Sequence, residues 1–204
     1  MSLARLLQLA SPTLPVGAYS YSQGLEAAVE AGIVKDAPSA EAWIGDALSF
    51  SVGRFEAPVL WRMMQGEALN DFFLASRETA ELRAETLQMG HSLKALVEEL
   101  GLGGVPVEEP SYPTVYAFAV ERMMLDRRDA LIAYLWSWLE NQVMAAVKTV
   151  PLGQTAGQKI LLALGSRLSD IARQAETIEP ANFVPGLAML STRHETQYSR
   201  LFRS

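Results

Sequence analysis

The sequence predicts an all-α protein, a single helical bundle of roughly eight to ten helices that spans residues 1–204. Its composition is rich in Ala and Leu and modest in β-branched residues, which favours helix. Apolar residues recur at helical spacing along most of the chain, and no segment shows a convincing alternation with the period of two that marks a half-buried strand. Half of the residues are hydrophobic and a fifth are charged, which suits a sizeable core.

Glycines and prolines divide the first part of the chain. We expect a helix over 3–10 that ends at Ser11-Pro12, and a second helix over 22–31 that Gly32 closes. A third helix carries Pro38 near its start and is expected to break at Gly53, because glycine loosens a helix. A further helix starts with Glu56-Ala57-Pro58, since proline is tolerated in a first turn.

The clearest expected helix runs from Arg77 to Leu100. Apolar or small residues recur there at spacings of three and four, which predicts a stripe facing the core. The stripe consists of Leu82, Thr86, Met89, Leu93, Leu96 and Leu100. The acidic side chains Glu78, Glu81 and Glu85 are interpreted as a solvated face, on which Arg77 can pair with Glu81 across one turn.

The second half of the chain begins with a loop rich in glycine and proline at 101–113. We do not divide the chain there, because the following helix, Tyr112–Met124, lacks polar residues to cover a free surface. Asp126–Asp129 is expected to form a charged turn, and Ala130–Val147 is apolar nearly all round, which predicts the centre of the bundle. The remaining expected elements are a helix that resumes after Pro151 and Gly153 and continues through Ile171, a loop at 180–186, a short helix, and the tail His194–Ser204.

Charge and cysteine content exclude several classes of protein. The net charge of -6 is opposite to the basic face of a nucleic-acid-binding protein, and no polybasic membrane patch is present. The absence of cysteine excludes disulfides, thiolate metal sites and a cysteine nucleophile. No run reaches the eighteen or so apolar residues of a membrane span, and the N-terminus lacks the features of a signal peptide. We expect a cytoplasmic protein that binds neither nucleic acid nor membrane.

Two segments resemble catalytic motifs and fail their tests. The segment Gly153–Lys159 has three residues between its glycines, and Gln158 separates the second glycine from Lys159, so it is not a phosphate-binding loop. A helix entry that lets backbones pack closely explains it better. His194-Glu195 resembles the start of a zinc-binding HExxH motif, but Tyr198 occupies the position of the second histidine.

The two histidines of the chain do not predict a catalytic or metal site. With no cysteine to assist them, His91 and His194 make a strong transition-metal site improbable, and we interpret them as surface residues. Neither lies in the context of a nucleophile elbow. We therefore expect no catalytic, cofactor-binding or metal-binding residues.

Binding residues are suggested at the two ends of the chain. The segment Ser11–Glu26 contains prolines, a flexible glycine and the rings of Tyr19 and Tyr21, followed by a helix start that Ser20 or Ser22 can cap. Either it is a packed turn whose tyrosines fill the core, or it is a recognition loop. The tail 198–203 carries Tyr, Arg, Leu and Phe, residue types that a frayed terminus would not ordinarily hold together and that should dock on this chain or on a partner.

Four separated motifs resemble the urease accessory protein UreF family. They are SPTLPVGAYSYSQGLE at 11–26, RETAELRAETLQMGHSL at 77–93, VPLGQTAGQ at 150–158 and HETQYSRLFRS at 194–204. Ala18 stands where the family often has a second glycine. The resemblance spans nearly the whole chain in order and implies an all-α protein that forms a homodimer and has no reaction of its own.

The resemblance implies a chaperone in nickel insertion. Such a protein bridges a UreD/UreH-type accessory protein and the nickel-carrying GTPase UreG on apo-urease, and it is proposed to regulate GTP hydrolysis. Nickel and GTP are then handled by partners, with no cofactor bound by this chain. The residues that it assigns to partner binding are Tyr19, Ser20, Tyr21, Glu26, Tyr198, Arg200, Leu201, Phe202 and Arg203.

One further hypothesis concerns how these residues cooperate. The tail is expected to fold back so that Arg200 orders the loop around Tyr19, by cation–π stacking or a hydrogen bond to the phenol.

Three alternative functions stay open. They are a helical enzyme with His194 and Glu195 as an acid/base pair, a direct nickel carrier, and a plain scaffold without influence on the GTPase.

Overall fold

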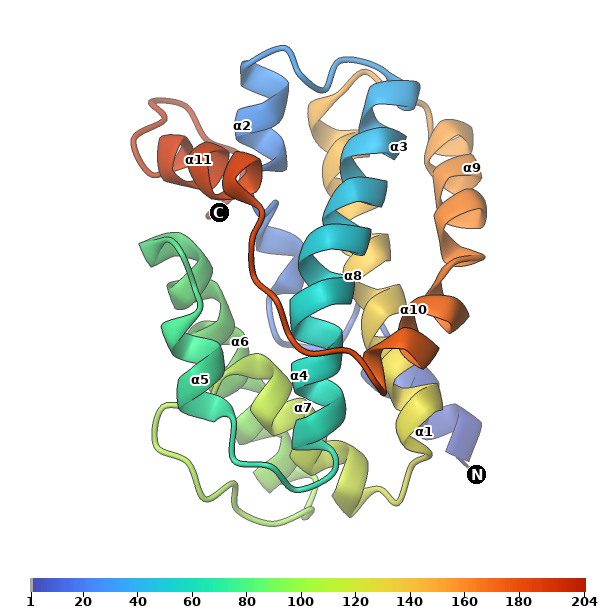
Figure 1. The fold of residues 1–204 in the computed structure, drawn as a ribbon, viewed down its shortest axis with the longest axis vertical. Helices are drawn as coiled ribbons and strands as arrows, with labels where there is room; N and C mark the ends of the chain where they lie inside the picture. Colours follow the sequence, from blue (N-terminus) through green and yellow to red (C-terminus); the bar gives the residue numbers. More distant parts are fainter. Residues whose placement is uncertain (1) are drawn as a thin grey trace.

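The computed structural model describes residues 2–204, and within this range regular structure is helical, without strands (Figure 1). The α-helices are α1 Ser2–Leu9, α2 Leu25–Glu30, α3 Ala37–Asp46, α4 Ala57–Met63, α5 Asn70–Ala75, α6 Ala80–Glu99, α7 Tyr112–Arg122, α8 Arg127–Thr149, α9 Gln154–Gly165, α10 Leu168–Ala175 and α11 Pro185–His194. A 3₁₀ turn, η1, covers Ala18–Ser20, and a π-helical segment, η2, covers Ala47–Glu56. The prediction of an all-α bundle of roughly eight to ten helices is confirmed.

Helix α8 forms the axis of the bundle, as its apolar sequence predicts. It contacts α1, α2, α3, α4, α9 and α10, and Leu131, Leu135 and Leu139 are fully buried on it. Its start is fixed by the Asp126 carboxylate, which accepts the backbone N–H groups of Arg128 and Asp129. The charged turn expected at 126–129 is therefore the capped first turn of this helix.

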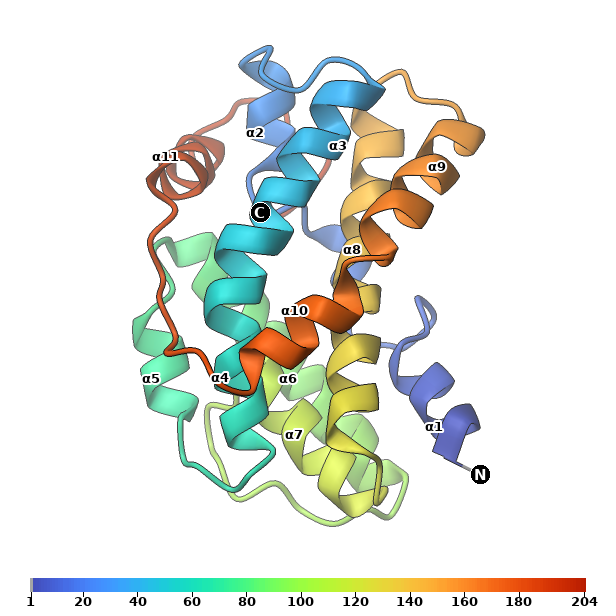
Figure 2. The same ribbon diagram turned by 45° about the vertical axis from the view of Figure 1, so that its right-hand side comes forward.

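Helices α3 and α4 form one rod with the π-helical segment between them (Figure 2). The break expected at Gly53 is wrong. A β-carbon at Gly53 would lie 2.7 Å from the Leu48 carbonyl oxygen and 3.1 Å from Ile171, so glycine allows the widened helix to continue against α10. The carbonyl of Arg54 accepts the N–H of Ala181, which ties the rod to the α10–α11 connection.

Helices α6 and α7 pack closely because Gly90 has no side chain. A β-carbon at Gly90 would lie 2.0 Å from the carbonyl oxygen of Pro110. On α6 the expected stripe is buried at Leu82, Thr86, Met89 and Leu93, whereas Leu100 is exposed at the helix end. Gly157 in α9 also permits a close contact, with Val147, which agrees with the predicted tight helix entry.

Other differences from the sequence-based expectation concern short helices. In α1, Leu9 enters the core while Leu3 and Leu7 are exposed. Helix α5 was not expected, and the helix predicted to run through Ile171 divides into α9 and α10 after Gly165. Intrinsic helix propensity predicts such short helices poorly, because their stability comes mainly from tertiary packing.

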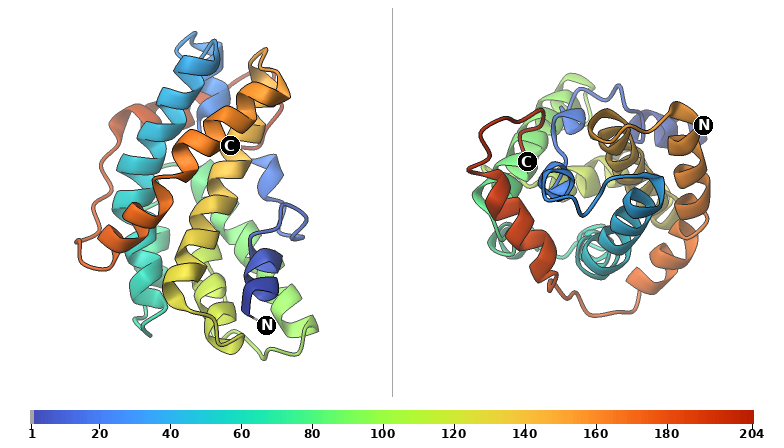
Figure 3. Two further views of the ribbon diagram at one scale, coloured as in Figure 1. Left: turned by 90° about the vertical axis from the view of Figure 1, so that its right-hand side faces the viewer. Right: turned by 90° about the horizontal axis from the view of Figure 1, so that it is seen from above.

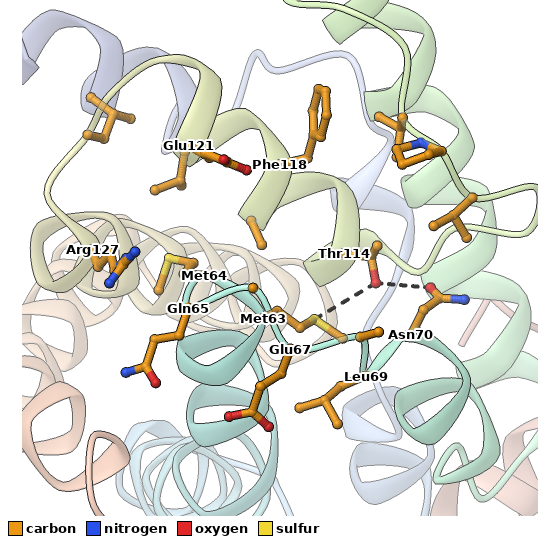
Figure 4. Close-up of a pocket in the computed structure, with 18 of the residues that line it drawn as sticks. Met63, Met64, Gln65, Glu67, Leu69, Asn70, Thr114, Phe118, Glu121 and Arg127 are labelled. Carbon is orange, nitrogen blue, oxygen red and sulfur yellow. Dashed lines mark hydrogen bonds between the residues drawn. The ribbon is translucent and has the colours of Figure 1, made fainter.

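The two ends of the chain lie on different sides of the molecule (Figure 3). The C-terminal residues return to α2, and Phe202 joins the same connected core as Leu9. None of the described helices is long and apolar enough to cross a membrane. A hollow of about 730 Å³ lies between the α4–α5 connection and α7, and its lining includes Met63, Leu69 and Phe118 (Figure 4).

Candidate functional site

The opening loop, residues 11–24, is shaped by three residues with positive φ. Gly17 and Gly24 adopt φ angles of 77° and 82°, and Gln23 has a φ of 52°. Gly17 precedes the turn η1, and Gly24 precedes α2. A β-carbon at Gly24 would also lie 3.4 Å from the backbone nitrogen of Ser191 in α11, so the loop and the last helix meet closely at this position.

The loop sends its two tyrosines in different directions. Tyr21 is buried, with 4% of its surface exposed, and its hydroxyl donates to Oε1 of Gln88 at 2.8 Å. Tyr19 is 66% exposed and borders a hollow of about 200 Å³ between the loop and α8. The sequence left open whether the tyrosines fill the core or form a surface. In the structure Tyr21 fills the core and Tyr19 lies on the surface.

The C-terminal strap, residues 199–204, lies against this loop. The Arg203 N–H donates to the Ser20 carbonyl at 2.8 Å, and the Ser22 N–H donates to the carbonyl of Ser204 at 2.8 Å. The hydroxyl of Ser22 is 2.5 Å from the same Ser204 oxygen. The Ser22 hydroxyl therefore donates to the strap and accepts the backbone N–H of Glu26, at 3.3 Å.

The carboxylate of Glu26 holds the strap from α2. Its Oε1 accepts the N–H of Leu201 at 2.7 Å, and its Oε2 accepts the N–H of Phe202 at 2.9 Å. Glu26 is buried, so these two amides replace the water that an ionised carboxylate would otherwise bind. The prediction that the tail folds back onto the opening segment is confirmed in this geometry.

His194 lies between two carboxylates and is not a surface residue. Its side chain is completely buried, with Nε2 3.1 Å from Oε2 of Glu26 and Nδ1 2.7 Å from Oε2 of Glu81. The interpretation of Glu81 and Glu85 as a solvated face is also wrong, because Glu85 is buried and Glu81 turns toward His194. The spacing of α6 could not reveal this, because the partners come from elements distant in the sequence.

Arg200 binds Glu81 and not Tyr19. Its Nη1 donates to Oε1 of Glu81 at 2.6 Å, so the expected cation–π contact or hydrogen bond with the Tyr19 phenol is wrong. The Glu81 carboxylate, whose side chain is only 13% exposed, attracts the guanidinium more strongly than an exposed ring does. Arg77, which was expected to pair with Glu81, binds Oε1 of Glu56 at 2.8 Å instead.

The proposed acid/base pair of His194 and Glu195 is not assembled. Both ring nitrogens of His194 face carboxylates, and Oε1 of Glu195 accepts the backbone N–H of Ala80 at the start of α6 at 2.8 Å. Glu195 therefore serves as a helix-terminus acceptor. Within residues 2–204, no group of three or more His, Cys, Asp or Glu side chains is arranged to hold a metal ion.

A cluster of hydrogen-bonded polar side chains, Gln23, Glu85 and Trp138, holds the end of the opening loop. Nε2 of Gln23 donates to Oε1 of Glu85 at 2.7 Å, and the Trp138 indole N–H donates to Oε1 of Gln23 at 2.7 Å. Burial raises the pKa of Glu85 to about 7, although hydrogen bonds from Gln23 and Ser204 oppose the shift. The pKa of Tyr21 is also raised, by burial first and then by the charge of Glu85.

Lys148 connects the loop side and the strap side of the site. It comes from the last turn of α8 and lines the same hollow as Tyr19. Its Nζ lies 5.6 Å from the ring centroid of Phe202, the buried aromatic side chain of the strap. Sequence reasoning missed Lys148, which lies outside the motifs. It also missed the role of Gln23, which lies within the 11–26 motif, because its partners Glu85 and Trp138 are distant in the sequence.

The nine residues assigned to partner binding fall into two sets. The exposed set contains Tyr19, Tyr198, Arg200, Leu201 and Arg203, and Ser20 is half-buried. The buried set, Tyr21, Glu26 and Phe202, positions the loop and the strap and is covered by them. We call the exposed side chains of the opening loop and of residues 198–203 the loop–strap surface.

Fold and site together define an all-α protein in which the opening loop and the C-terminal strap form one ordered surface. A sequence model described as UreF matches residues 34–165. Proteins named "Urease accessory protein UreF" from Azoarcus sp. (strain BH72) and Dechloromonas aromatica (strain RCB) are 52% and 50% identical; each comparison covers 100% of this chain, and 96% and 98% of the relative. The corresponding protein of Methylobacillus flagellatus is 52% identical over 100% of this chain and 98% of its own length.

The chain belongs to the UreF family of urease accessory proteins. The family resemblance predicted from the four motifs is therefore confirmed. The relatives are named as accessory proteins of urease and not as enzymes, which agrees with the expectation that this chain has no reaction of its own.

Proposed function

We propose that this chain is an adaptor in urease maturation that joins a UreD/UreH-type accessory protein and the nickel-carrying GTPase UreG on apo-urease. The observation that carries the proposal is the loop–strap surface. Its exposed aromatic and arginine side chains are of the types that dominate binding energy at interfaces. The buried Glu26 and Ser22 fix their backbone before a partner arrives, which lowers the entropic cost of association.

Nickel and GTP belong to the partners in this proposal. The chain contributes surface and geometry, and its own histidines take no part in nickel transfer. The homodimer and the cytoplasmic location implied by the family resemblance form part of the same proposal. A surface that exists once on each chain would be present twice in a homodimer, so two copies of each partner would be accommodated.

Urease activation tests the adaptor proposal directly. The urease subunits, the UreD/UreH-type protein and the UreG-type GTPase are co-expressed with nickel, with and without this chain, and urease activity and bound nickel are measured. We expect both to fall at least tenfold without the chain. Equal activity and equal nickel content in the two preparations would overturn the proposal.

Regulation of the GTPase is a second, separable part of the proposal. GTP turnover by the UreG-type protein is measured with and without this chain, in the presence of the UreD/UreH-type protein. A change in the turnover rate supports a regulator. An unchanged rate, together with intact complex formation, would identify a plain scaffold.

A further inference from the structure

His194 is fully buried, faces two acidic groups and contacts the strap through them. Each ring nitrogen is within hydrogen-bond distance of a carboxylate oxygen, Nδ1 of Glu81 and Nε2 of Glu26. A neutral imidazole has one N–H and one lone pair, so it can donate to only one of these carboxylates. The other nitrogen would then present its lone pair to a carboxylate oxygen.

The other contacts of the two carboxylates favour their ionised forms. Glu26 accepts the backbone N–H groups of Leu201 and Phe202, and Glu81 accepts the guanidinium of Arg200. Hydrogen bonds donated to a carboxylate stabilise its charged form. With Glu26 and Glu81 both negative, a doubly protonated His194 satisfies every contact and gives the cluster a net charge of zero with Arg200.

We propose that His194 is held as an imidazolium and that its second N–H proton keeps the C-terminal strap docked. When this proton leaves to solvent, one nitrogen loses its donor and faces a carboxylate without a hydrogen. The two negative carboxylates then share a site with only Arg200 to balance them, which disfavours the docked geometry. The strap would loosen at Leu201 and Phe202, whose amides depend on Glu26.

The charged groups around His194 come from four elements. Glu26 reaches it from α2, and Glu81 reaches it from α6, where the buried Glu85 lies one turn further along. Arg200 belongs to the strap. On the side of α11 itself, the carboxylate of Glu195 is turned toward the backbone of α6.

This role of the His194 proton belongs to the chain by itself and does not depend on the adaptor function. Its first test is the protonation state of the ring. The variant His91→Gln removes the only other histidine of the sequence, so ¹⁵N-histidine signals then come from His194 alone. At pH about 7 we expect one-bond N–H couplings at both ring nitrogens. A coupling at one nitrogen only would overturn the proposal.

The second test measures the strap. In His194→Gln we expect the amide protons of Leu201 and Phe202 to exchange at least tenfold faster, relative to the amide of Leu135 in α8. His91→Gln is the matched control and should leave this ratio unchanged, because His91 is exposed. An unchanged ratio in His194→Gln would overturn the proposal. If His194→Gln does not fold, the ring couplings of the first test decide alone.

A pH series separates the proton from the side chain. The exchange ratio between Leu201 and Leu135 is followed as pH rises, in a Glu85→Gln background, because Glu85 also titrates and touches Ser204 at 2.8 Å. We expect the ratio to increase with pH when His194 is present and to stay constant in His194→Gln. A ratio that increases equally in both proteins would contradict a role for the His194 proton.

Discussion

Nε2 of His194 lies 3.1 Å from Oε2 of Glu26, although 168 positions separate these residues in the sequence. The contact joins the last helix of the bundle to its second helix. The same carboxylate accepts two backbone amides of the strap, so one residue of α2 binds both His194 and the strap. The order of the loop–strap surface therefore depends on buried groups beneath it.

Removal of the Glu26 carboxylate should destabilise the whole fold. Glu26→Ala leaves Nε2 of His194 and the amides of Leu201 and Phe202 without an acceptor, and we expect a loss of about 3–5 kcal/mol in the free energy of unfolding. Urea denaturation measures it. Glu30→Ala, on the exposed side of the same helix, is the control and should change the value by less than about 0.5 kcal/mol. Equal stability of the two variants would contradict this role of Glu26.

The buried ion pair of Arg77 and Glu56 should be sensitive in the same way. Tyr134 donates to Oε2 of Glu56 at 3.0 Å, and the Arg77 guanidinium lies 4.3 Å from the ring centroid of Phe73. Glu56→Ala leaves the buried guanidinium without its counter-charge, so we expect a loss of about 3–5 kcal/mol by denaturation.

The control for this pair is Glu179→Ala. Its carboxylate pairs with Arg62 at 2.8 Å but is 86% exposed, and such pairs contribute about 0–1 kcal/mol. A similar loss in Glu56→Ala and Glu179→Ala would show that burial of the Arg77 pair has no energetic consequence.

Gly90→Ala should disrupt the contact between α6 and α7. The new β-carbon would lie 2.0 Å from the Pro110 carbonyl oxygen, so the helices must separate, and overpacking of this kind costs about 1–3 kcal/mol or more. The melting temperature measures it. Gly153→Ala has open space around the new carbon and ordinary φ, so its melting temperature should remain close to that of the unmodified protein. A stable Gly90→Ala protein would rule out the close approach.

The stability of the protein should fall as pH rises toward neutrality because of Glu85. Its pKa is about 7 in the folded protein and near 4.5 in an unfolded chain. Between these values the folded state holds a proton that the unfolded state has released, so the free energy of unfolding decreases with rising pH, by roughly 3 kcal/mol at most. Glu85→Gln should flatten this dependence.

The pH dependence is measured by urea denaturation between pH about 5 and about 8. Glu99→Gln, an exposed change at the end of the same helix, is the control and should retain the slope. A slope that Glu85→Gln leaves intact would assign the effect to another group.

Much of the fold could be predicted because helical periodicity and punctuation residues act locally. The long helix through Leu131, Leu135 and Leu139 is apolar nearly all round and lies at the centre, as its pattern predicts. The break expected at Gly53 is wrong because glycine can either end a helix or permit a π-helical turn. Which of the two occurs depends on tertiary contacts, here on Ile171, which packs against Gly53.

The residues of the site could be predicted better than their contacts. Tyr19, Glu26 and Arg200 were found through local motifs, and they lie in one region of the structure. Their partners were not predictable: Glu81 appeared to belong to a solvated face, and it binds His194 at the end of α11 and Arg200 of the strap, which the fold brings to α6 from more than 100 positions away. Such long-range polar contacts leave no periodic signal in the sequence.

The central claim is that the loop–strap surface binds the maturation partners. Its most direct test is the dissociation constant of the UreG-type GTPase for a complex of this chain with the UreD/UreH-type protein, measured for Tyr19→Ala and Leu201→Ala. Leu162→Ala is the control, since Leu162 is 80% exposed on α9 and outside this surface. We predict that at least one of the two surface variants fails. Either Tyr19→Ala raises the dissociation constant of the GTPase about tenfold or more, or Leu201→Ala prevents assembly of the complex, while Leu162→Ala has no effect. Unchanged assembly and unchanged affinity in both surface variants, with folding intact, would contradict the account.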